Sequence, residues 1–178
     1  MRKFLLMAIA LVLFASAARL TAQGPPEVKP GPEHMKLKDS EGIWDATIKS
    51  KDGDSKATIS CKVDLNGLWL LEHFKADLGG TPFEGRGTLS YDPAKKKYVH
   101  VWISSMATFP QVSEGTYDAT TKTMILVGDM PTPDGKSIKA TLTTVMKDAD
   151  TRTFTIRGAG QDGKDFEMLN ITYKRRVK

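Results

Sequence analysis

The sequence predicts an all-β protein, a single antiparallel up-and-down barrel of about ten strands with a short N-terminal helical cap. Runs of alternating apolar and polar residues recur along the chain at similar spacing, separated by short turns rich in Gly, Asp, Asn and Pro. No segment between them is long and periodic enough to be a crossover helix, so consecutive strands are expected to pair with each other. Closing such a sheet into a barrel removes its exposed edges.

The first 22 residues are predicted to be a secretory signal peptide that precedes the fold. Two basic residues follow the first Met, residues 4–14 are all apolar, and small residues occupy 15–18. The apolar run is too short to span a bilayer as a permanent helix, so no stable membrane insertion is expected after cleavage. Cleavage after Ala17 and cleavage after Ala22 both fit and remain open. We therefore expect an exported protein, either periplasmic or extracellular.

The net charge narrows the classes of partner that the protein is expected to bind. The whole chain carries a net charge of +5, but residues 1–22 hold three basic residues and no acidic one, so the charge falls to +2 without them. A nearly balanced surface gives no reason to expect nucleic acid as a partner.

Cys61 is the only cysteine, which excludes an internal disulfide. Its neighbours of the same strand parity are apolar, which predicts a buried thiol.

The chain after the signal peptide is expected to hold one domain. Residues 23–32 are rich in Pro and Gly and read as a linker, and the barrel domain follows at 33–178. Residues 33–41 are the one segment expected to be helical. The expected strands are residues 42–48, 56–64, 68–77, 82–91, 97–103, 112–118, 123–129, 137–147, 152–159 and 165–175.

The hairpin from Pro82 to Ile103 is the most informative of these. Its Asp-Pro turn predicts that Tyr91 pairs with Tyr98, Leu89 with His100, and Gly87 with Trp102. An indole opposite glycine can lie across the bare backbone, so Gly85 and Gly87 are predicted to give Trp102 its space.

An ordered set of short motifs runs through the barrel domain. The motifs are His34-x-x-Leu37, Gly42-x-Trp44, Leu65-x-Gly67, Pro82-Phe83-x-Gly85, Tyr91-Asp92, Lys97-Tyr98, Trp102, Gly115-x-Tyr117-Asp118, Asp162-Gly163-Lys164 and Ile171-Thr172-Tyr173-x-Arg175. Over about residues 34–176 this set resembles the bacterial domain-of-unknown-function family 1579. The resemblance implies a calycin-like, lipocalin-related barrel, and it implies no activity because the family has none assigned.

The same resemblance suggests two structural residues. In lipocalins a Trp near the first strand and an Arg near the last stack at the closed end of the barrel, which here implies a contact between Trp44 and Arg175. The resemblance also gives an argument against haem, because nitrobindin-like barrels of similar strand number carry their proximal histidine near the C-terminus. Residues 101–178 contain no histidine. We therefore expect no cofactor.

Candidate ligand contacts come from the aromatic and histidine residues of the strands. The candidates are Tyr98, His100, Trp102, His73 and Tyr117. For each one, the alternative is a wall or core residue with no ligand. The three histidines of the chain show no His-x-x-x-His spacing, so no metal site is predicted. No nucleophile or phosphate-loop motif occurs, so no catalytic residue is assigned.

Three functions remain open from the sequence. The first is an exported barrel that binds a small, mostly apolar ligand, because about ten strands leave space inside. The second is an interaction or assembly module whose barrel is packed solid. The third is an enzyme that uses His73, His100 or Glu84 as acid or base at the barrel mouth.

Overall fold

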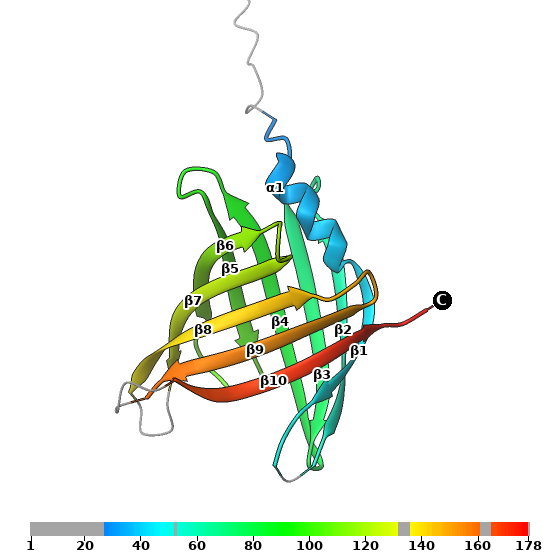
Figure 1. Cartoon of the computed structure of the whole chain (residues 1–178), viewed down its shortest axis with the longest axis vertical. Coiled ribbons are helices and arrows are strands. Elements are labelled where there is room, and N and C mark those ends of the chain that lie inside the picture. The colour runs from blue at the N-terminus through cyan, green and yellow to red at the C-terminus, as the bar shows by residue number, and fades with distance from the viewer. Residues whose placement is uncertain (1–26, 52, 132–135, 161–164, 178) are drawn as a thin grey trace, which may run out of the picture.

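The computed structural model describes residues 27–51, 53–131, 136–160 and 165–177 and shows a closed antiparallel barrel (Figure 1). Each strand pairs with its neighbours in sequence, and β1 pairs with β10 to close the ring. The strands are β1 (Gly42–Ile48), β2 (Ser55–Asp64), β3 (Trp69–Leu78), β4 (Thr81–Asp92), β5 (Lys97–Ser104), β6 (Gln111–Asp118), β7 (Thr123–Pro131), β8 (Ser137–Met146), β9 (Thr151–Ala159) and β10 (Asp165–Arg175). The predicted fold class is confirmed.

The segments expected ahead of the barrel are only partly described. The signal peptide predicted at 1–22 and the start of the linker predicted at 23–32 lie outside the described residues. Residues 27–31 have no regular secondary structure. In the part of the chain that is described, no helix combines the length and the apolar character needed to cross a bilayer.

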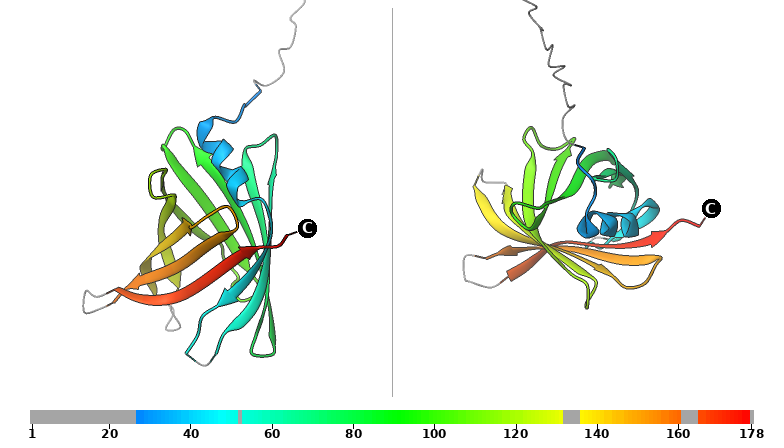
Figure 2. Two further views of the ribbon diagram at one scale, coloured as in Figure 1. Left: turned by 45° about the vertical axis from the view of Figure 1, so that its right-hand side comes forward. Right: turned by 90° about the horizontal axis from the view of Figure 1, so that it is seen from above.

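One end of the barrel is covered by a short helical segment, α1 (Pro32–Met35) followed by the 3-10 helix η1 (Lys36–Ser40). Figures 1 and 2 show it lying across that end, which we call the closed end. Leu37 anchors it with only 2% of its surface exposed. The Tyr98 hydroxyl donates to the Glu33 carbonyl at 2.9 Å. The opposite end, where the β1–β2, β3–β4 and β5–β6 connections lie, is called the open end.

The register of the central hairpin is the predicted one. Tyr91 pairs with Tyr98, Leu89 with His100 and Gly87 with Trp102. Because side chains alternate between the two faces of a strand, this register points all of these residues toward the barrel interior. Gly85 is the next inward position, where an added Cβ would lie 2.1 Å from Cζ2 of the Trp102 indole. The two glycines therefore give the ring its space.

Arg175 joins the barrel seam to the helical segment. It pairs with Trp44 across the β1–β10 ladder, and its guanidinium carbon lies 4.0 Å from the centre of the indole. Its N–H groups donate to the carbonyl oxygens of Asp39 at 2.9 Å, of Ala149 at 3.0 Å and of Glu41. The contact that the resemblance implied is thus present, and one side chain connects η1, the β8–β9 turn and the last strand.

The tightest packing lies at the closed end. Trp44, Leu37 and Leu70 have the most completely buried large side chains among the described residues. The Trp44 indole N–H donates to the Ser40 carbonyl at 3.0 Å, so its one polar atom is satisfied despite full burial. Packing on this side leaves the interior toward the open end free for a cavity.

We predict that Arg175→Ala lowers the free energy of unfolding by about 1–3 kcal/mol, because it uncovers the indole and leaves carbonyl groups unpaired. Urea denaturation measures the change. Lys174→Ala, which removes an exposed side chain one position away, serves as the control and should change stability by less than about 0.5 kcal/mol. Equal stability of the Arg175→Ala variant and the parent would show that the stacked contact does not hold the closed end.

Candidate functional site

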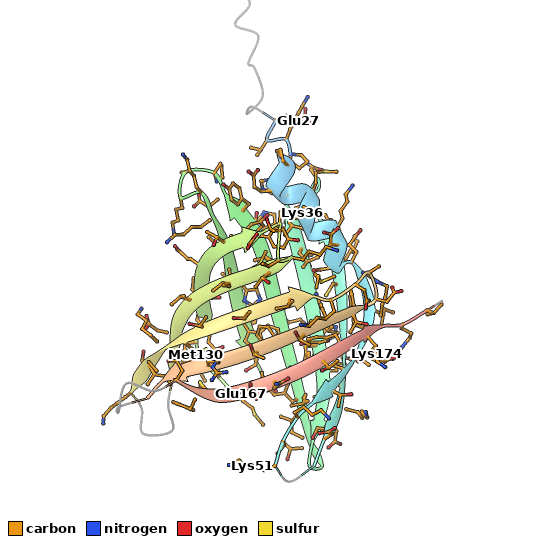
Figure 3. All side chains as sticks on the ribbon, viewed as in Figure 1. Glu27, Lys36, Lys51, Met130, Glu167 and Lys174 are labelled. Carbon is orange, nitrogen blue, oxygen red and sulfur yellow. The ribbon has the colours of Figure 1, made fainter. Side chains whose placement is uncertain are left out.

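The barrel interior holds a cavity of about 360 Å³. Its walls are mainly apolar, with large contributions from Phe74, Trp102, Leu126, Leu142, Ile156 and Ile171. Ile48, Leu78 and Ser104 also line it, and each is the last residue of its strand at the open end. Met130, labelled in Figure 3, belongs to this rim as well. The cavity therefore runs from the open end toward the packed closed end.

Three polar side chains form the inner boundary of the cavity, and we call Glu72, His100 and Arg152 the polar floor. All three line the cavity. Nε2 of His100 lies 2.9 Å from Oε2 of Glu72, and the two side chains are 15% and 14% exposed. A histidine bonded to a carboxylate can exchange a proton with a bound molecule, and the same pair can offer polar contacts to a ligand.

Gly87 makes the contact between Glu72 and His100 possible. It lies on β4, between Glu72 on β3 and the β5 strand that carries His100, and it pairs directly with Glu72. A Cβ at this position would lie 2.4 Å from Oε2 of Glu72 and 2.9 Å from Nε2 of His100. The hydrogen bond therefore crosses the bare backbone of a glycine, and no other residue type leaves that path open.

The charge state of Glu72 follows from its surroundings. Burial disfavours the carboxylate, but the hydrogen bond with His100 and the positive charges of His100 and Arg152 outweigh burial and hold the pKa of Glu72 below its ordinary value. Glu72 is therefore an ionised acceptor, and His100 donates through Nε2.

Arg152 is the second charged group of the floor and is 5% exposed. Its guanidinium carbon lies 4.5 Å from the Trp44 ring centre and 4.8 Å from that of Tyr173. Its Nη2 lies 3.5 Å from Sγ of Cys61. Burial, with a further contribution from the negative charge of Glu72, raises the pKa of Cys61 to about 12, so the thiol stays neutral.

The structure brings two of the five candidate ligand residues to the cavity, His100 and Trp102. Tyr98 is 3% exposed and lies under the helical segment, where burial raises its pKa to about 12. Tyr117 also lies near that segment, with Nζ of Lys36 5.8 Å from its ring centre. Neither tyrosine is part of the cavity wall, so both pack at the closed end.

His73 lies on the outer face of β3, because it alternates with the inward Glu72 and Phe74. Its Nε2 is 2.6 Å from Oε1 of Glu84, which Arg86 also contacts at 2.9 Å. The Glu84 side chain is 48% exposed. Of the three residues considered as acid or base at the barrel mouth, His73 and Glu84 thus contact each other on the outer surface, and only His100 lines the cavity.

Arg152 and Glu72 are the floor residues that the list of candidates from the sequence did not include. The signal for Arg152 was available, because Arg152 shares strand parity with Phe154 and Ile156 and is a charged residue on an otherwise apolar face. The assignment of Glu72 to the interior needed the parity of β3, whose two faces are both rich in apolar residues. The cavity itself does not fit the alternative of a barrel packed solid.

Comparison with protein families gives one match. A family described as "Protein of unknown function (DUF1579)" matches residues 29–175, which covers the helical segment and the whole barrel. No curated protein matches the sequence at a significant level.

Solved structures that share the fold include two with a TM-score above 0.5. Rv2717c from M. tuberculosis superposes with a TM-score of 0.60 at 13% identity, over 83% of this chain and 99% of that protein. The S-type phycobiliprotein lyase CPES from Guillardia theta gives a TM-score of 0.54 at 12% identity, over 84% of this chain and 100% of that protein. Identities this low show a common barrel fold alone.

We predict that Gly87→Val lowers the free energy of unfolding by about 1–3 kcal/mol, although valine is the better strand former. The branched side chain meets the Glu72 carboxylate first and separates it from His100. Thr88→Val, one residue further and on the opposite face of β4, is the matched control and should stay within about 0.5 kcal/mol of the parent. A Gly87→Val protein as stable as the Thr88→Val protein would contradict this account of the glycine.

The depressed pKa of Glu72 predicts a pH dependence of stability. Because the folded-state pKa lies below the ordinary value of 4.5, the stabilisation is complete above pH 4.5 and is lost as the pH falls through the folded-state pKa. Glu72→Gln should therefore flatten the acid side of the stability–pH curve, measured by urea denaturation from about pH 7 to about pH 3. Glu27→Gln, which alters an exposed carboxylate ahead of the barrel, should leave the curve unchanged. Parallel curves for the parent and Glu72→Gln would refute the assignment.

Proposed function

This chain belongs to the DUF1579 family of proteins of unknown function, and we propose that it is an exported barrel that binds a small, mostly apolar molecule in its interior. One observation carries the proposal, the apolar cavity of about 360 Å³ that reaches the open end. Small-molecule sites are typically concave, mainly apolar and supplied with a few fixed polar groups. The volume lies near the lower limit of the usual range of about 300–1,000 Å³.

The polar floor supports binding rather than a passive void. A cavity that stays empty is lined by apolar groups, whereas this one ends at the polar side chains of Glu72, His100 and Arg152. Their positions are fixed from both sides, by the Glu72–His100 hydrogen bond and by the rings of Trp44 and Tyr173 around Arg152. Fixed polar groups at one end of an apolar channel orient a ligand that has one polar end.

Export is the second part of the proposal and rests on residues 1–22. The basic start, the apolar run of 4–14 and the small residues at 15–18 fit a secretory signal peptide. Periplasmic or extracellular placement follows from it. An exported binding barrel has a plain physical use, since it holds an apolar molecule that water would otherwise exclude.

Mass spectrometry of the protein purified from an exporting cell tests both parts. The denatured mass should correspond to a chain that begins between Ala18 and Gln23. The native mass should exceed it by one small molecule, or should do so after incubation with fatty acids, isoprenoids or tetrapyrroles. A chain that still begins at Met1 would refute export, and a native mass unchanged by all of these compounds would refute binding.

A matched pair of variants on β5 places the bound molecule. Ser104 lines the cavity at the open end, whereas its neighbour Ile103 is 52% exposed on the outer face. Ser104→Trp should narrow the entrance and reduce binding of the molecule found by native mass spectrometry at least about tenfold. Ile103→Trp adds the same ring outside and should leave binding unchanged. Equal effects of the two variants would place the ligand elsewhere.

A further inference from the structure

Arg152 is a buried cation whose hydrogen-bonding capacity is largely unused. A guanidinium carries five N–H donors, yet the one acceptor that the described residues offer it is the sulfur of Cys61, at 3.5 Å. The buried Nε–H has no partner among the described residues. Thiol sulfur is a weak acceptor, so most of the donor capacity of Arg152 remains unmet.

Arg152 also forms no ion pair with the described residues, although its charge acts on the Glu72 carboxylate from a greater distance. Within the described part of the chain, no carboxylate oxygen lies within the 4.0 Å of an ion pair with its guanidinium. The Glu72 carboxylate, which shares the floor, is hydrogen-bonded to His100 instead. Trp44 and Tyr173 interact with the cation through their rings and provide no anionic charge. A buried charge without a paired anion is costly, so such a group is expected to have a partner that completes it.

A partner can reach Arg152 through the cavity, whose wall includes it. We propose, building on the binding function above, that Arg152 binds the carboxylate of an amphipathic monocarboxylate whose apolar part fills the cavity. The carboxylate lies at the polar floor, and the apolar part extends along Phe74 and Trp102 toward the open end. The ligand therefore enters with its charged end first.

A carboxylate fits this position better than the other anionic groups. The planar fork of a guanidinium matches the two oxygens of a carboxylate. A phosphate monoester carries close to two negative charges at neutral pH, and its second charge would meet the ionised Glu72 in the same floor. A neutral hydroxyl would leave Arg152 without a directly paired anion. The floor therefore selects a single negative charge.

Titration calorimetry on the full chain, freed of bound lipid, tests this with three probes of equal chain length: decanoate, 1-decanol and decyl phosphate. Decanoate should bind at least about tenfold more tightly than 1-decanol, because a hydrogen-bonded ion pair replaces a neutral contact. In Arg152→Met, which keeps an unbranched apolar side chain beside Trp44, that preference should disappear while 1-decanol still binds.

Each of the other outcomes contradicts a specific part of the two proposals. Equal binding of decanoate and 1-decanol to the parent would overturn the role of Arg152 and leave the binding function standing. Tighter binding of decyl phosphate than of decanoate would overturn the carboxylate assignment. Failure of all three probes to bind the parent, with no small molecule seen by native mass spectrometry, would overturn both proposals. If Arg152→Met does not fold, the comparison of the three probes on the parent decides the question.

Discussion

The closed end of the barrel depends on one aromatic ring held between two cations. The indole of Trp44 has the Arg175 guanidinium at 4.0 Å and the Arg152 guanidinium at 4.5 Å from its centre. Arg175 faces the helical segment and bonds its carbonyl groups, while Arg152 faces the cavity. The same ring thus joins the seam between the first and last strands to the floor of the interior. The Trp44 ring therefore interacts both with the cation that holds the closed end and with the cation of the polar floor.

The glycines on β4 have the complementary role, because a residue without a side chain leaves room for larger side chains from the neighbouring strands to meet. Gly85 lies under the Trp102 indole, and Gly87 lies under the contact between Glu72 and His100. A strand of branched residues would be more favourable locally and would fill this space. The local cost is offset by an aromatic wall and a polar pair that the interior could not otherwise hold. The cavity is consequently a product of small residues at selected inward positions.

Alternation along strands made the fold predictable, since side-chain parity, turn residues and the absence of crossover helices all act locally. The Asp-Pro hairpin fixed the register of Gly87 against Trp102, which the ladder confirms. His73 and His100 were equivalent candidates by composition, and the registers of β3 and β5 placed one outside and the other inside. Tyr98 and Tyr117 have the parity of cavity residues, but their height in the barrel puts them beneath the helical segment. Alternation along a strand shows which face of the sheet a side chain lies on, whereas its position along the barrel is known only from the closed barrel.

The sequence by itself determined an antiparallel barrel of hairpins, which follows from periodicity and turn chemistry acting over short stretches of chain. The order of its motifs gave the family resemblance, and that resemblance implied the contact between Trp44 and Arg175. Only the tertiary structure decided that Glu72, His100 and Arg152 share one floor. They lie on three strands, and the contact between the first two crosses a fourth. Only ring closure also decided that Arg152 forms no ion pair with the described residues, because the pairing of a buried charge depends on every strand around it.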